Sequence, residues 1–331
     1  MALPSVHIIG LGGTISMASS GALGVVPSLT AEELSATLPQ LAGVASLCAS
    51  SLRMVAGSSL SLDDLLATAT EAQRRLDEGA DGVVVTQGTD TIEEVAFALD
   101  LLVAGDGPVV VTGAMRNPTQ PGADGPANLL AAVQVAASPQ ARGLGALVVF
   151  ADEVHAARFV QKAHTQSTGA FRSRPAGPIG WVAEGRVRIV TRPIGRRHLV
   201  LPADAPDRPV ALVTLALGDD GRLLRAVEDL GYAGLVVEAL GGGHAPAPLA
   251  DALGHLAAAM PVVLASRTGC GEILQRTYGF TGSESDLLAR GLIPAGALDG
   301  PKARILLWLL LRSAAGRVEI ARAFETGMVS P

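Results

Sequence analysis

The stretch 83–94, VVVTQGTDTIEE, combines the pattern of a buried strand with residue types that can do chemistry. It opens with three valines, which are typical of a strand buried on both faces. Polar residues follow, and a helical pattern with acids in its first turn begins at Ile92. A polar loop between a buried strand and a helix lies at the carboxyl end of a sheet, where α/β proteins hold their ligands. We therefore expect Thr89 and Asp90 to line a site, with Gly88 allowing close approach of the backbone.

The alternative is that this loop only caps a helix. Asp90 or Thr91 would then be the N-cap residue, and Glu94 would complete a capping box. One cap residue is enough for that purpose, so a cap leaves Thr89 and Asp90 together partly unexplained. We therefore favour a site.

Three more predicted strands end in small or hydroxylated turns, at Thr14, at Ser58 and Ser59, and at Ala114. Thr14 follows two glycines at the end of a buried strand, so its hydroxyl is an accessible candidate nucleophile. A threonine that merely ends a strand by its β-propensity is the alternative. Ser61 and Asp64 are predicted to cap the next helix, which leaves Ser58 and Ser59 free for other roles. Four turns that converge at one sheet edge are what a pocket there requires.

Lys162 lies in a polar stretch, 152–174, that shows no regular pattern. A buried lysine beside a desolvated hydroxyl can have its pKa lowered enough to accept a proton near neutrality. Lys162 is therefore a candidate base. A solvated surface lysine is the alternative, and composition alone favours it.

The overall composition argues against several classes of protein. The 331 residues carry a net charge of −6, which disfavours nucleic acid partners, and 3% aromatic residues leave few platforms for stacking bases. No apolar run reaches the ~18 residues that a membrane span needs, and the N-terminus lacks the features of a signal peptide. Two distant cysteines and scattered histidines offer no ligand spacing. We expect a soluble cytoplasmic protein that needs no metal or organic cofactor.

The elements that position these residues are predicted to form two α/β domains. In residues 1–192 strands alternate with helices, including a short strand at 52–56 and an edge strand at 186–191. Residues 193–209 hold four prolines and several charges without periodicity, which is typical of a linker. In residues 210–331 three strand–helix units indicate a smaller parallel α/β domain.

Several motifs together resemble the bacterial-type L-asparaginase family. They are Gly12-Gly13-Thr14-Ile15, Thr86-Gln87-Gly88-Thr89-Asp90-Thr91-Ile92-Glu93-Glu94, Gly113-Ala114-Met115-Arg116, and Ala123-Asp124-Gly125-Pro126 followed by Asn128. They keep the family's order, and the match covers essentially the whole chain. The resemblance implies an asparaginase-like α/β fold, with a larger N-terminal domain on a mixed or parallel sheet and a smaller C-terminal parallel domain. It also implies hydrolysis of L-asparagine to L-aspartate and ammonia.

The resemblance further implies a division of chemical roles. Thr14 would attack the side-chain amide and carry a β-acyl group. Thr89, Lys162 and Asp90 would then move protons and orient the water. The backbone N–H of Thr89 would bind the developing oxyanion, and the Ala114 carbonyl would receive the leaving amide.

The residues that would hold the substrate follow from the same motifs. Ser58 would bind the substrate carboxylate and Asp90 its ammonium, with Ser59 and Gly88 lining the same site. Position 59 is glutamine in the periplasmic enzymes and often serine in the cytoplasmic type. The chain is therefore nearer the cytoplasmic type.

The chain also departs from the family. Gln87 stands where a histidine is usual, and His244 ends a glycine run that lacks the asparagine of the periplasmic type. Val25 stands where many members carry the tyrosine that activates the nucleophile. In this family the small domain of one subunit completes its neighbour's site, so we expect Tyr278 to reach Thr14 across the interface of a homodimer or homotetramer. A loop aromatic packed on the domain surface is the alternative.

Three other functions stay open. The enzyme could hydrolyse glutamine as well as asparagine. It could be the related subunit that supplies ammonia to amidate misacylated tRNA, although that subunit usually has an extra N-terminal domain and binds tRNA. A non-catalytic amino-acid sensor on the same scaffold would be expected to lose Thr14, Thr89 or Lys162, and all three are present.

Overall fold

The computed structural model describes residues 2–19, 25–27 and 29–325, with the backbone alone for 17–19 and 25–27. The chain divides into two compact units between His198 and Leu199, within the segment 193–209 that the sequence marks as a linker. Both units are layered α/β structures, so the predicted fold class is confirmed.

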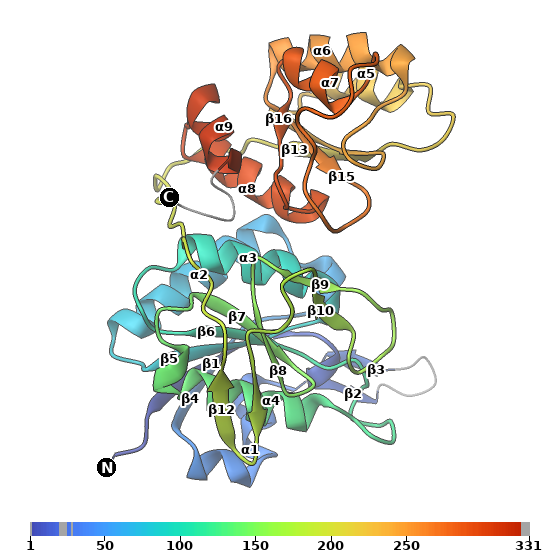
Figure 1. Ribbon diagram of the computed structural model, residues 1–331. Coiled ribbons are helices and arrows are strands. Elements are labelled where there is room, and N and C mark those ends of the chain that lie inside the picture. The colour runs from blue at the N-terminus through green and yellow to red at the C-terminus, as the bar shows by residue number, and fades with distance from the viewer. Residues whose placement is uncertain (1, 20–24, 28, 326–331) are drawn as a thin grey trace. The chain divides into compact units, whose positions relative to one another are not determined.

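The larger unit is built on an eight-stranded sheet with the order β12-β11-β8-β7-β6-β5-β1-β4 (Figure 1). Its strands are β1 (Ser5–Gly12), β4 (Ser46–Val55), β5 (Gly82–Thr86), β6 (Val109–Thr112), β7 (Ala146–Phe150), β8 (Glu153–Ala156), β11 (Gly180–Ala183) and β12 (Arg186–Ile189). Two separate hairpins pair β2 (Met17–Ser19) with β3 (Val25–Pro27) and β9 (Val160–Lys162) with β10 (Phe171–Ser173). Strands β4, β1, β5, β6 and β7 are parallel, whereas β8, β11 and β12 are antiparallel to their neighbours. The sheet is therefore mixed.

Helices cover both faces of this sheet, with α1 and α4 on one side and α2 and α3 on the other (Figure 1). Their bounds are α1 (Ala31–Ala36), α2 (Leu62–Asp77), α3 (Ile92–Leu102) and α4 (Gly125–Ala136). Every residue of β5 and β6 is buried, because each strand has a helix layer on either side. This arrangement explains the valine runs, which leave no polar face.

The smaller unit is built on a four-stranded parallel sheet with the order β13-β14-β15-β16. Its strands are β13 (Val210–Thr214), β14 (Gly234–Ala239), β15 (Val262–Ser266) and β16 (Ile293–Pro294). Its helices are α5 (Arg222–Asp229), α6 (Ala250–Ala259), α7 (Glu284–Ala289), α8 (Gly300–Arg312) and α9 (Arg317–Glu325). The predicted smaller parallel domain is thus confirmed, with one further strand, β16, that is too short to show a pattern.

Two predictions of local structure are wrong. The strand predicted at 52–56 in fact begins at Ser46. The first half of β4 is missed because it holds mainly small residues and none of the β-branched or aromatic residues that mark a strand. The sequence predicts an irregular segment at 152–174, but this segment contains β8, β9 and β10, each three or four residues long. Strands of that length do not repeat a pattern often enough to be recognised. The edge strand predicted at 186–191 is confirmed as β12.

His155 on β8 is fully buried and makes folding sensitive to pH. Its Nδ1 lies 3.0 Å from Ser173 Oγ on β10, and its Nε2 lies 3.4 Å from a Glu153 carboxylate oxygen. Burial, with a smaller effect of the Arg172 charge, lowers the pKa of His155 from 6.5 to about 4. The folded protein therefore binds fewer protons here than the unfolded chain does. The stability that this difference contributes is complete above pH 6.5 and is lost as the pH falls towards 4.

We predict that His155→Asn, which keeps a polar atom near Ser173, makes the free energy of unfolding less dependent on pH. Between pH 7 and pH 5 the wild type should lose about 2 kcal/mol more than the variant, from the linkage of one such histidine. Chemical denaturation at both pH values measures this difference. His255→Gln is the matched control, because that side chain is 74% exposed. An equal pH dependence in wild type and His155→Asn would contradict the prediction.

Candidate active site

The turns that follow β1, β4, β5 and β6 meet backbone against backbone. A Cβ atom on Gly13 would lie 2.0 Å from the Gly88 nitrogen, and one on Gly57 would lie 2.7 Å from the Gly88 oxygen. A Cβ on Gly113 would lie 2.5 Å from the Gln87 carbonyl oxygen. Only glycine permits such contacts between backbones. The structure therefore brings the four predicted turns together at one sheet edge.

Hydrogen bonds hold these turns in register. The Gly13 N–H donates to the Val55 carbonyl at the end of β4 over 3.0 Å. The Thr91 hydroxyl donates to the Gly57 carbonyl, also over 3.0 Å. Thr91 is the N-cap residue of α3, but its side chain makes no capping hydrogen bond. Helix capping therefore does not account for the hydroxyls of this loop.

Lys162, the last residue of β9, reaches the turn after β5. Its Nζ donates to Thr89 Oγ1 over 2.8 Å and to Asp90 Oδ1 over 2.7 Å. Its backbone N–H donates to the Glu93 carboxylate in the first turn of α3 over 2.8 Å. The lysine side chain is only 16% exposed, so Lys162 is not a solvated surface lysine. An amine, a hydroxyl and a carboxylate thus form one connected group.

The remaining hydroxyls lie in two short 3-10 turns. Thr14 is partly buried in the turn directly after Gly13, next to the Gly88 backbone. Ser58 and Ser59 are exposed in the turn that begins at Gly57. Ser61 starts the capping box of α2, as the sequence predicts, and that box uses neither Ser58 nor Ser59.

The turn after β6 is braced by two residues whose role the sequence does not reveal. Ala114 is buried there, and the carbonyl of its neighbour Gly113 accepts a hydrogen bond of 3.0 Å from Asn128 Nδ2. The Asp124 carboxylate accepts from the Met115 N–H over 3.0 Å. Both residues belong to a motif of the sequence, and their partners lie 15 and 9 residues away, so the path of the chain after β6 brings them close.

Two further residues bear on the activation of Thr14, namely Val25 and Tyr278. Val25 belongs to β3, and its side chain lies outside the described residues. Tyr278 belongs to the smaller unit, in the loop between β15 and α7, and is 46% exposed. Its N–H donates to the buried Glu284 carboxylate over 2.7 Å, and its ring centroid lies 5.0 Å from that of His244. The function of Tyr278 stays a prediction.

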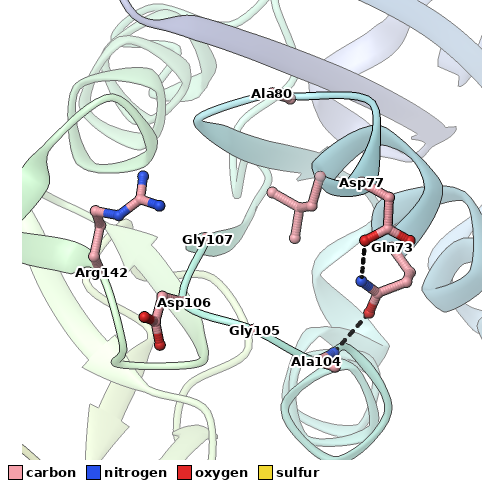
Figure 2. Close-up of a pocket in the computed structure, with 9 residues that line it drawn as sticks. Gln73, Asp77, Ala80, Ala104, Gly105, Asp106, Gly107 and Arg142 are labelled. Carbon is pink, nitrogen blue, oxygen red and sulfur yellow. Dashed lines mark hydrogen bonds between the residues drawn. The ribbon is translucent and has the colours of Figure 1, made fainter.

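A cavity of about 350 Å³ lies at the opposite end of the parallel strands, where β5, β6 and β7 begin (Figure 2). It is lined by residues 73, 76, 77 and 80, by residues 104–107 and by Arg142, which precede β5, β6 and β7. None of the predicted site residues lines it. Within the described part of the chain, no three His, Cys, Asp or Glu side chains are grouped so as to hold a metal ion. No helix in the same part is long and apolar enough to span a membrane.

Comparisons with known proteins bear on both units. The family model "Asparaginase, N-terminal" matches residues 5–195, and "Glutaminase/Asparaginase C-terminal domain" matches residues 209–324. A probable L-asparaginase from Deinococcus radiodurans is 42% identical over 264 residues, which are 76% of this chain and 77% of that protein. L-asparaginase 2 from Escherichia coli is 32% identical over 333 residues, covering 98% of this chain and 94% of that protein.

The crystal structure of a probable cytoplasmic L-asparaginase from Campylobacter jejuni has the same fold. Its TM-score with this chain is 0.87 at 28% identity, covering 97% of this chain and 99% of that one. Two domain models in the expected order and relatives that match along the chain lead to one conclusion. The chain belongs to the asparaginase family.

Proposed function

We propose that the protein hydrolyses L-asparagine to L-aspartate and ammonia through a β-acyl-enzyme on Thr14. Membership of the family supports the reaction, because relatives from several organisms carry the name L-asparaginase. The observation that carries the proposal is the contact of Lys162 Nζ with Thr89 Oγ1 and Asp90 Oδ1. In this proposal Lys162 is the proton acceptor, the Thr89 hydroxyl relays the proton, and the Asp90 carboxylate lies beside both, next to the turn that bears Thr14.

The first half of the reaction forms an ester. The Thr14 oxygen adds to the amide carbon of the substrate, and the Thr89 N–H donates to the oxygen that becomes negative. Such a donor typically lowers the barrier by about 3 kcal/mol. Collapse of the adduct breaks the C–N bond, and the nitrogen takes up the proton that the Thr14 hydroxyl gave up and leaves as ammonia past the Ala114 carbonyl.

The second half hydrolyses that ester with water. Lys162 in its uncharged form accepts a proton from the water through the Thr89 hydroxyl, and Thr14 regains its hydrogen as aspartate leaves. The free enzyme pairs Lys162 with Asp90. A substrate ammonium bound at the same carboxylate would weaken that pair and, as a like charge, would favour the uncharged amine.

Substrate binding uses the exposed part of the same turns. Asp90 is 60% exposed and can accept from the substrate ammonium, while the hydroxyl of Ser58 can donate to the substrate carboxylate. Ser59 directly follows Ser58 in the chain, and Gly88 lies two residues before Asp90. These two contacts would hold the amino-acid end and leave the side-chain amide to face Thr14.

Glutamine is the nearest alternative substrate. It is one methylene longer, a difference that a pocket discriminates by only ~1–3 kcal/mol. Ammonia release from L-asparagine, L-glutamine and D-asparagine separates the preferences, and binding without release would identify a sensor. A cytoplasmic location is also a proposal, supported by the name of the Campylobacter jejuni protein, whereas a relative from Haemophilus influenzae is named as periplasmic.

We also propose that Tyr278 of a neighbouring subunit accepts the proton of the Thr14 hydroxyl. Val25 leaves the loop after Thr14 without a tyrosine, and a hydroxyl nucleophile needs a proton acceptor. Tyr278 is exposed and held at its backbone by Glu284, so its phenol is free to contact a second copy of the chain. The protein would then act as a homodimer or homotetramer.

Mixing two inactive variants tests the roles of Thr14 and Tyr278 together. We expect Thr14→Ala to lose several orders of magnitude in turnover and Tyr278→Phe to be nearly inactive. With random pairing in a two-fold dimer, half of the dimers are mixed, and each mixed dimer has one intact site of two. Roughly a quarter of wild-type ammonia release should therefore return.

The controls for this experiment are each variant alone at the same total concentration. No recovery on mixing would mean that one subunit builds the whole site. A fully active Tyr278→Phe would remove Tyr278 from the mechanism, and Thr14→Ala with a tenth of wild-type turnover would exclude Thr14 as the nucleophile.

Lys162→Met keeps the length of the side chain and removes the amine. Because Lys162 is assigned to ester hydrolysis, steady-state turnover should fall by about 10²–10⁴-fold, the usual contribution of a general base. Rapid mixing should still show a first burst of ammonia of up to one equivalent per active site. Equal melting temperatures of variant and wild type would exclude unfolding as the cause. Wild-type turnover in Lys162→Met would reduce Lys162 to a structural residue.

A further inference from the structure

Gln87 lies between β5 and the turn of Thr89, and it is completely buried. Its N–H donates to the Thr112 carbonyl at the end of β6 over 3.1 Å. Its carbonyl oxygen lies so close to Gly113 that a Cβ atom there would be 2.5 Å away. The backbone of Gln87 is therefore held in place by the neighbouring strand. This fixes the position from which its side chain extends.

The side-chain amide of Gln87 folds back onto the turn. Its Nε2 donates to the Gly88 carbonyl over 3.2 Å and to Thr91 Oγ1 over 3.3 Å. The Thr91 hydroxyl in turn donates to the Gly57 carbonyl. The amide thus connects both ends of the turn that contains Thr89. The reverse orientation would point the amide oxygen at the Gly88 carbonyl, two acceptors in contact, so the observed orientation is fixed.

The Gly88 carbonyl and the Thr89 N–H belong to the same planar peptide group. A donor on the carbonyl oxygen fixes the plane of that group and polarises it, which makes its N–H a stronger donor. We propose that Gln87 is the positioning residue for the Thr89 N–H, which it aims at the developing oxyanion and strengthens. This inference rests on the proposed function, in which that N–H stabilises the transition state.

A cost in stability supports this role over a purely structural one. Gln87 Oε1 is buried and has no hydrogen-bond partner among the described residues. A buried acceptor without a partner destabilises a fold, whereas an apolar side chain of similar shape carries no such penalty. The amide of Gln87 therefore lowers the stability of the fold through its oxygen, while its nitrogen donates to the turn that contains Thr89.

Three variants separate the roles of shape and hydrogen bonding. Gln87→Met keeps the length without a donor, Gln87→Glu keeps the shape but replaces the donor by an acceptor, and Gln87→His offers a ring N–H. Gln73→Met is the matched control, because Gln73 also bonds a backbone group, the Ala104 N–H over 2.7 Å, but at the opposite sheet edge (Figure 2).

We expect Gln87→Met to lower kcat by about 10–100-fold, less than the loss of an oxyanion donor itself. Its KM should stay within about threefold, because the interaction acts in the transition state. Gln87→Glu should lose at least as much, Gln87→His should recover part of kcat, and Gln73→Met should match wild type. The amide nitrogen resonance of Thr89 should shift in Gln87→Met, while the affinity for L-aspartate and the melting temperature change little.

Several results would overturn the inference. They are unchanged kcat in Gln87→Met, a loss that follows the melting temperature across the variants, and a higher KM with kcat preserved. Assays of the wild type and of Thr14→Ala in parallel distinguish a failure of the proposed function from a failure of the role of Gln87. A wild type that releases no ammonia from L-asparagine would refute the proposed function and with it this role of Gln87. An active wild type with an equally active Gln87→Met would refute the role of Gln87 alone.

Discussion

The candidate active site of the larger unit depends on a contact between three backbones, with Gly88 between Gly13 and Gly57. Because no side chain separates these turns, residues that follow different strands become neighbours without any long connecting loop. Gly13 has a φ of +82°, a conformation that other residues rarely adopt, so glycine serves here both for the turn and for the contact. Thr14 directly follows Gly13 and Thr89 directly follows Gly88, so this contact fixes where their hydroxyls lie.

A hairpin outside the main sheet supplies an amine that the ends of the parallel strands lack. The parallel strands end in hydroxyls and small residues, and the amine comes from the hairpin of β9 and β10, where Lys162 pairs with Phe171. The contact between His155 and Ser173 ties this hairpin to β8, and the Glu93 carboxylate binds the Lys162 N–H. The lysine is thus fixed at its backbone and at its amine, as the catalytic role proposed for it requires.

The sequence predicts those features that depend on local patterns. Valine runs mark the strands because both sheet faces are buried, and the Ser61 capping box marks the start of α2. Hydroxylated turns indicate the four loops of the site. The surroundings of Lys162 could not be derived in this way, because a lone lysine in a polar stretch most often lies in solvent, and its partners are far away in sequence. The sequence also does not reveal that Gln87 Oε1 lacks a hydrogen-bond partner, because that depends on which donors the fold brings near it.

Replacement of Gly57 by alanine tests most directly whether the backbone contact organises the site. The three atoms nearest to a Cβ at Gly57 would be backbone atoms of Gly88, at 2.7 to 3.0 Å, so the turns must move apart. Gly43→Ala is the matched control, since a Cβ there meets nothing within 4 Å. Displacing catalytic groups by about 1 Å can cost about 10²-fold, so kcat/KM for L-asparagine should fall on that order in Gly57→Ala and stay unchanged in Gly43→Ala. Full activity in Gly57→Ala would contradict the dependence of the site on this contact.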